Sequence, residues 1–366
     1  MKQKRLTFLL LLISNLFCAS AQKWYKPEID LKVEELLSQM TVEEKLGYIG
    51  GIDWMYTKSI DRLGIHRMRM SDGPQGIGTK GKSTAYPATV TLAATWNENL
   101  AYQYGKALGR DCRARNINVI LGPAVNIYRA PMCGRNFEYM GEDPYLTSRI
   151  CVGYIKGVQD QGVMATVKHF VANNSDYDRN NISNDIDERT LNEIYFPAYK
   201  AAIQEAEVGA IMTSYNLMNG IYTTENPWLL KEVLRNQWGF KGLVMSDWGS
   251  THYCVPAARS GLDLEMAGGE KMNPKDMAYY LKTGDVTMDM VDEKVRHILR
   301  ILIAFGFKDG TEADKSIALD DPQSVETALN VAREGLVLLK NENNILPEAF
   351  DPRVADTVSK AIKDLI

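Results

Sequence analysis

The sequence has 366 residues, of which 45% are hydrophobic and 24% charged, a composition typical of a globular protein that buries a sizeable core. Its formal net charge is −4, and it contains no lysine- or arginine-rich run. This charge pattern offers no surface for a phosphate backbone, so it argues against nucleic acid as a partner.

The first 21 residues have the form of an export signal. Basic residues among the first five precede an apolar run at 6–17, and Ala-Ser-Ala at 19–21 supplies a small-x-small cleavage site. Cys18 could begin a lipoprotein, but the bulky Phe17 before it argues against that alternative. No later segment approaches the roughly 20 apolar residues of a membrane span. We therefore expect export to the periplasm or the medium, with Gln22 as the first mature residue.

Short apolar segments then alternate with longer amphipathic ones. A helix should begin at Thr41, where Glu44 three residues later completes a capping-box signature. An apolar stripe at 291, 295, 298, 302 and 305 predicts a helix over about 289–305. Buried strands are expected at Val119–Leu121, 164–167, Ala210–Thr213 and Leu243–Met245, with helices near 100–115, 145–159, 188–207 and 228–237.

This alternation predicts an α/β fold, and a (β/α)8 TIM-barrel-like domain over residues 22–310 is the simplest arrangement. A doubly wound sheet would be expected to carry a G-x-G-x-x-G turn, which the glycine-rich pieces here do not match. Residues 311–324 are polar and turn-rich, so they are expected to be a linker. Residues 325–366, with a helical pattern followed by a strand-like one at 336–339, would be the truncated start of a second domain or a tail.

Cysteine and histidine spacings indicate neither a disulfide scaffold nor a metal site. The five cysteines contain no C-x-x-C pair, although one or two bridges could form after export. The four histidines show no H-E-x-x-H spacing. We therefore expect no cofactor and no catalytic metal.

Polar residues collect where the apolar segments end. The run 67–70 is followed by Ser-Asp-Gly-Pro at 71–74, and the later strands are followed by Lys168-His169, by Ser-Tyr-Asn at 214–216 and by Ser-Asp-Trp at 246–248. In a barrel of parallel strands these residues converge at the C-terminal mouth. Carboxylates, a lysine and an aromatic face are suited to a sugar, whereas the clustered arginines or P-loop of a phosphate site are absent from the sequence.

Six short motifs in this order resemble glycoside hydrolase family three, over about residues 30–347. They are Ser-Asp-Gly-Pro at 71–74, Gly-Arg-Asn-Phe-Glu at 134–138, Gly-Glu-Asp-Pro at 141–144, Lys-His-Phe at 168–170, Met-Thr-Ser-Tyr-Asn at 212–216 and Met-Ser-Asp-Trp at 245–248. Val-Leu-Leu-Lys-Asn-Glu at 337–342 and Leu-Pro at 346–347 resemble the start of that family's second, α/β sandwich domain.

The resemblance implies a retaining β-glycosidase in which Asp247 is the nucleophile. It implies that the non-reducing terminal sugar is held by Asp72, Arg135, Lys168 and His169. Tyr215 would lie beside the nucleophile, Met212 would line the pocket and Trp248 would stack on the leaving group. Each could instead be structural: Asp247 as a strand-end cap, Arg135 as an ion pair with Glu138 or Glu142, and Met212 or Trp248 as core. Aspartate rather than glutamate at 72 resembles the glucosidases of the family more than its xylosidases, which implies β-glucose rather than β-xylose.

A retaining enzyme also needs a proton donor, with the two carboxyl groups about 5 Å apart. In most two-domain members of the resembled family the donor is a glutamate of the second domain, and single-domain members use a His–Asp pair that residues 171–176 lack. Three interpretations remain. The chain is a fragment of a two-domain β-glucosidase, or it recruits Glu142, Asp176, Asp178 or a partner subunit, or it is a non-hydrolytic sugar-binding protein.

Overall fold

The computed structural model describes residues 22, 24–78 and 82–337. The predicted export signal at 1–21 lies outside these residues, as does the second half, 338–339, of the strand expected at 336–339. Within the described ranges, no helix is both long and apolar enough to cross a membrane.

The main sheet has five parallel strands in the order β1-β2-β3-β5-β8. They are β1 (Met70–Asp72), β2 (Val119–Leu121), β3 (Met164–Phe170), β5 (Ala210–Thr213) and β8 (Leu243–Met245). Single bridges extend the β8 side through Met245–Leu264 and Glu265–Gly50, while Tyr56 pairs with Arg69 beside β1. A small second sheet has the order β4 (Ser183–Asn184), β6 (Leu217–Met218), β7 (Ile221–Tyr222).

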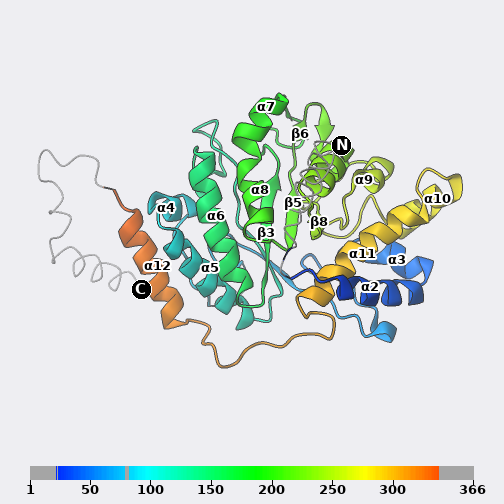
Figure 1. Ribbon diagram of the computed structural model, residues 1–366, viewed down its shortest axis with the longest axis horizontal. Coiled ribbons are helices and arrows are strands. Elements are labelled where there is room, and N and C mark those ends of the chain that lie inside the picture. The colour runs from blue at the N-terminus through cyan, green and yellow to red at the C-terminus, as the bar shows by residue number, and fades with distance from the viewer. Residues whose placement is uncertain (1–21, 23, 79–81, 338–366) are drawn as a thin grey trace, which may run out of the picture.

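Helices flank the main sheet (Figure 1). On one side lie α4 (Thr89–Ala94), α5 (Glu98–Arg113), α6 (Pro144–Gln159), α7 (Glu188–Thr190) and α8 (Pro197–Gln204), and on the other α2 (Pro27–Gln39), α3 (Val42–Tyr48), α9 (Cys254–Ser260), α10 (Pro274–Thr283) and α11 (Met288–Ala304). The remaining helical segments are η1 (Asp61–Leu63), η2 (Asn136–Glu138), η3 (Leu191–Tyr195), η4 (Thr223–Glu225), η5 (Trp228–Gln237) and α12 (Pro322–Gly335). The predicted α/β, TIM-barrel-like fold class is confirmed.

Four strands were predicted from continuous apolar runs, and every residue of β2, β3, β5 and β8 is buried. Strands covered on both faces select apolar residues at consecutive positions, which explains the lack of alternation. One boundary differs from expectation. Strand β3 continues to Phe170 through a register shift between Val167 and Phe170, so Lys168 and His169 lie inside the strand and are buried despite their polarity.

Two helix predictions hold in detail. At Thr41 the side chain accepts a hydrogen bond from the Glu44 amide while the Glu44 carboxylate accepts one from the Thr41 amide, and α3 begins at Val42. In α11, the stripe residues at 291, 295, 298 and 302 are fully buried. The chain therefore encodes both a helix start and a buried helix face locally.

The single helix expected over 188–207 is divided. Helix α7 passes into the π-helical turn η3, and α8 restarts at Pro197. Proline has no amide hydrogen and its ring clashes with the carbonyl four residues earlier, so an α-helix cannot run through it unchanged. Instead, the backbone before Pro197 forms a wider, π-helical turn, in which the Phe196 amide donates to the Leu191 carbonyl at 2.8 Å.

Helix α12 packs against α5 and α4, after a connection that crosses beneath the sheet from α11 (Figure 1). Arg110 of α5 pairs with Asp321 at 2.7 Å, and the Ser324 hydroxyl donates to Asp111 at 2.9 Å. The C-terminal end of the segment expected as a linker, 311–324, thus contacts helix α5 of the predicted barrel domain. The start of a second domain after this segment stays a prediction. Cys112, Cys133, Cys151 and Cys254 are free thiols, so no disulfide forms among the described cysteines.

Candidate active site

The carboxyl ends of adjacent parallel strands bring the predicted site residues together. Asp72 ends β1, Lys168 and His169 lie in β3, Tyr215 follows β5 by two residues, and Asp247 follows β8 by two. Arg135 joins them from the loop before η2. Contacts connect these six residues, and the other two predicted site residues, Met212 and Trp248, are described separately below.

Asp247 is 7% exposed and has two unlike carboxylate oxygens. Its Oδ1 accepts a hydrogen bond from the Trp248 amide at 2.7 Å. Its Oδ2 has no hydrogen-bond partner among the described residues and lies 3.6 Å from His169 Nε2. Desolvation raises the pKa of Asp247, although the charges of Lys168 and Arg135 oppose that rise. One oxygen is anchored and the other is free to react, as a nucleophile requires.

Lys168 interacts with two carboxylates: it donates a hydrogen bond to Asp72, and its positive charge acts on Asp247. It is 3% exposed, and its Nζ donates to Asp72 Oδ1 at 2.8 Å, while the Gly73 amide donates to the same oxygen at 2.9 Å. Desolvation acts against ionisation of Asp72, but the Lys168 charge and these hydrogen bonds hold the pKa of Asp72 below its usual value. The Asp72 side chain is 60% exposed, so an ionised acceptor faces solvent where a sugar hydroxyl could bind.

Arg135 contacts two side chains: Glu138, which is not one of the predicted site residues, and His169, which is. Its Nε makes a close ion pair with Glu138 Oε1, as the structural alternative anticipated, and its Nη2 lies 2.7 Å from His169 Nε2. Its positive charge also acts on Asp247. The ion pair with Glu138 therefore fixes the guanidinium in the site.

His169 is held as a neutral imidazole. Because Arg135 can only donate, His169 Nε2 must accept, which places the proton on Nδ1, 3.3 Å from Asn126 Oδ1. The Asn126 side chain also accepts from the His169 amide at 2.8 Å and donates to the His169 carbonyl at 2.9 Å. Desolvation, together with the charges of Arg135, Lys168 and Arg179, keeps the pKa of His169 well below its usual value.

Tyr215 lies beside Asp247, and desolvation together with the negative charge of Asp247 raises the pKa of the Tyr215 hydroxyl. The guanidinium of Arg179 stacks over the Tyr215 ring, 4.2 Å from its centroid. Arg179 also pairs with Asp176 at 3.5 Å. Of the predicted donor alternatives, Asp176 is thus tied to the site, whereas Glu142 and Asp178 are exposed.

Sequence reasoning missed Asn126 and Arg179. Asn126 follows β2 by five residues, so the strand-end pattern could have identified it had β2 been treated like its neighbours. Arg179 lies in the connection between β3 and β4, far from any strand end, and no local signal marks it.

Trp248 is hydrogen-bonded to Asp247, whereas Met212 lies within strand β5. The Trp248 amide donates to Asp247, and its indole N–H donates to the Trp54 carbonyl at 2.9 Å, so Trp248 is tied to Asp247. Met212 is buried in β5 in register with Met245, and its role as a pocket wall stays a prediction.

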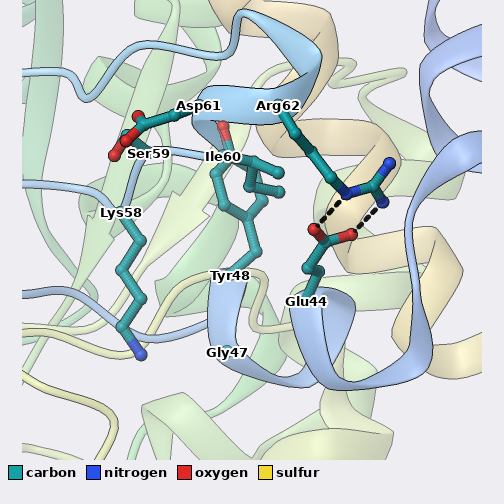
Figure 2. Close-up of a pocket in the computed structure, with 8 residues that line it drawn as sticks. All are labelled: Glu44, Gly47, Tyr48, Lys58, Ser59, Ile60, Asp61 and Arg62. Carbon is teal, nitrogen blue, oxygen red and sulfur yellow. Dashed lines mark hydrogen bonds and ion pairs between the residues drawn. The ribbon is translucent and has the colours of Figure 1, made fainter.

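Two cavities lie apart from these residues. One, of about 270 Å³, lies between α3 and residues 58–62, where Arg62 makes a two-point ion pair with Glu44 and Lys58 points away from Tyr48 (Figure 2). The other, of about 240 Å³, lies between α5 and α12. Neither cavity is lined by a residue of the cluster around Asp247. The candidate site is therefore identified by the side chains that meet there and not by the volume of a cavity. No group of three or more metal-ligating side chains occurs within the described part of the chain.

The chain is similar to proteins named as β-glucosidases. The chain is 42% identical over 323 residues to a β-glucosidase of Rhizobium radiobacter, covering 87% of this chain and 39% of that protein. It is 39% identical to the thermostable β-glucosidase B of Acetivibrio thermocellus, covering 86% of this chain and 43% of that protein. The structure of β-glucosidase 3B from Thermotoga neapolitana in complex with α-D-glucose superposes with a TM-score of 0.79 at 35% identity, covering 86% of this chain and 48% of that one.

This chain therefore spans less than half the length of these relatives. Residues 41–301 match the family described as glycosyl hydrolase family 3, N-terminal domain. The chain belongs to glycosyl hydrolase family 3.

Proposed function

We propose that this chain is the sugar-binding, nucleophile-bearing part of a retaining β-glucosidase that acts on terminal, non-reducing β-D-glucosyl residues. The observation that carries the proposal is Asp247, with one carboxylate oxygen anchored by Trp248 and the other unpartnered beside His169. The names of the relatives, and the glucose bound in the Thermotoga neapolitana and Kluyveromyces marxianus structures, support glucose as the sugar.

In the proposed reaction Asp247 Oδ2 attacks the anomeric carbon, and the bond from that carbon to the leaving oxygen breaks with its electron pair on the oxygen. Water then attacks the glycosyl ester, which releases glucose with its configuration retained and returns the carboxylate. Lys168 and Arg135 stabilise the ionised Asp247 before attack. Asp72 accepts hydrogen bonds from sugar hydroxyls because its charge is maintained by Lys168.

The proton for the leaving oxygen must come from another group. Lys168 holds Asp72 ionised, so Asp72 is not a suitable acid at neutral pH. Glu138 is ion-paired with Arg135, and Asp176 is ion-paired with Arg179. We propose that the donor is a carboxyl group outside this cluster, in a partner subunit or in a further part of the protein. The shares of the relatives that this chain covers support that proposal.

Kinetics with a matched set of substrates test the proposal. 2,4-Dinitrophenyl β-D-glucoside needs little acid assistance, so the protein should hydrolyse it, and should hydrolyse the corresponding β-D-xyloside more slowly. Cellobiose, whose leaving group must be protonated, should resist unless the donor is present. Sugar-dependent thermal stabilisation without turnover of the activated glucoside would contradict the hydrolase and favour a sugar-binding protein.

We further propose that the protein is exported to the periplasm or the medium, on the basis of the basic, apolar and small-residue segments of residues 1–21. Intact-mass analysis of the protein expressed from its full reading frame should find Gln22 at the N-terminus of the fraction outside the cytoplasm. A full-length N-terminus retained in the cytoplasm would contradict export.

A further inference from the structure

Glu265 is a buried carboxylate that the proposed mechanism does not use. It is 2% exposed, and its two oxygens accept hydrogen bonds from the backbone amides of Lys271, at 2.9 Å, and Met272, at 2.6 Å. Desolvation raises the pKa of Glu265, although these hydrogen bonds oppose the rise. Because burial disfavours the ionised form in the folded chain, an ionised Glu265 costs stability at neutral pH, which indicates a role other than folding.

The hydrogen bonds of Glu265 close a loop that runs from residue 266 to residue 272. The backbone of Glu265 is fixed at the start of this loop, since its amide donates to the Ile49 carbonyl at 2.9 Å and its carbonyl accepts from the Gly51 amide at 3.0 Å. Packing against the loop is tight there, because a Cβ on Gly51 would lie 2.5 Å from Met266 Sδ. The Glu265 side chain therefore joins the two ends of a loop that has little room to move.

The first residue of this loop, Met266, holds the turn that carries Asp247. The Met266 amide donates to the Ser246 hydroxyl at 2.8 Å, and the Ser246 hydroxyl donates to the Met266 carbonyl at 3.3 Å. The same carbonyl accepts from the Gly249 amide at 3.1 Å. Ser246 precedes Asp247 by one residue and Gly249 follows it by two, so the backbone of Met266 contacts this turn on both sides of Asp247.

We infer that Glu265 is a positioning residue for Asp247: it fixes the 266–272 loop, and the loop fixes the turn from which the Asp247 carboxylate attacks. This inference rests on the proposed function. Attack requires the carboxylate oxygen to lie close to the anomeric carbon and in line with the leaving oxygen, so a small shift of the turn lowers the rate. The proposed sugar contacts of Asp72 and Lys168 come from β1 and β3 and would stay in place.

Labelling kinetics with 2-deoxy-2-fluoro-β-D-glucosyl fluoride separate positioning from sugar binding. The rate at saturating reagent reports attack by Asp247, and the half-saturating concentration reports binding of the sugar. In Glu265→Gln one side-chain NH2 group faces backbone amides that can only donate, so the loop must shift. The rate should fall about tenfold, and the half-saturating concentration should change by less than about twofold. A wild-type rate in folded Glu265→Gln would overturn the inference.

Asp111→Asn is the matched control. Asp111 is a buried carboxylate in α5 that accepts hydrogen bonds from the hydroxyls of Tyr86, at 2.8 Å, and Ser324, at 2.9 Å, and desolvation raises its pKa as well. The variant should change the urea-denaturation midpoint but keep the wild-type labelling rate. An equal fall in rate in Asp111→Asn and Glu265→Gln would show that the rate follows stability, and would overturn the inference.

Ser246→Ala tests the same chain of contacts if Glu265→Gln does not fold. It removes the hydroxyl that Met266 contacts, so labelling should slow with sugar binding retained, and a wild-type rate would overturn the inference. The double variant Glu265→Gln/Ser246→Ala should be about as slow as the slower single variant, because both changes interrupt one path, whereas losses that multiply would contradict that path. If the folded wild-type protein is not labelled at all, the proposed function fails and this inference fails with it.

Discussion

Lys168 sets the electrostatic character of the site because a single buried ammonium acts on two carboxylates. It donates to Asp72 and lowers the pKa of that group, and its charge opposes the desolvation that raises the pKa of Asp247. A lysine that is only 3% exposed needs a charged hydrogen-bond partner to offset the loss of water around its ammonium group, and Asp72 is that partner. Asp72 and Asp247 are therefore electrostatically linked.

Lys168→Met should move the acidic limb of the kcat/KM profile for 2,4-dinitrophenyl β-D-glucoside to higher pH. Asp247 attacks only when ionised, so activity falls as the pH falls through its pKa, and removal of the nearby positive charge raises that pKa further. The plateau should also fall about tenfold or more because Asp72 loses a charged hydrogen-bond partner. Lys45→Met on α3 is the control, and a limb that moves to lower pH would contradict this account.

His169 should remain neutral, with its proton on Nδ1, over the pH range in which an ordinary histidine titrates, because its pKa is held well below the usual value. Nitrogen-15 spectra should show the Nδ1–H pattern for His169, assigned by the His169→Gln variant. Asn126→Asp should raise the pKa of His169, because a carboxylate in place of the Asn126 amide favours the protonated ring. A wild-type His169 signal that titrates in this range would refute the tautomer assignment.

The strands show how much of the site could be read from sequence. Apolar runs located β2, β5 and β8, and the polar residues that follow them predicted Tyr215 and Asp247. Asn126 and Arg179 could not be placed in the same way, because they act through contacts with His169 and Tyr215 that only the folded chain creates. The broken 188–207 helix depended on Pro197, whose effect on the preceding turn an apolar pattern does not reveal.

In helix α11 the packing follows directly from the sequence, because the apolar stripe forms one face of the helix and this face is buried in the core. Leu302→Ala should lower the free energy of unfolding by about 3 kcal/mol, because Leu302 is fully buried and its truncation leaves a cavity. The neighbouring Ile303 is only partly buried, so Ile303→Ala should cost less than half as much. Urea denaturation measures both, and equal costs would show that the buried face is misassigned.

At the scale of the whole molecule, the fold brings the proposed nucleophile and the proposed sugar contacts together beside carboxylates that are already paired. The other carboxylates in or beside the cluster are each paired with a basic residue: Asp72 with Lys168, Glu138 with Arg135, and Asp176 with Arg179. The relatives that share this domain are more than twice as long as the segment that aligns with it. A division of the reaction between two parts of a larger protein accounts for both observations, and the resistance of cellobiose together with turnover of the activated glucoside would be its kinetic signature.

The most direct test of Asp247 as nucleophile is covalent labelling with 2-deoxy-2-fluoro-β-D-glucosyl fluoride, which needs no proton donor to form the glycosyl ester. Intact mass should rise by one fluoroglucosyl group, and peptide mapping should place it on Asp247. Asp247→Asn should abolish the label, while Asp61→Asn, on the remote η1 segment, should retain it. Folded protein that stays unlabelled, or a label on a different carboxylate, would contradict the account.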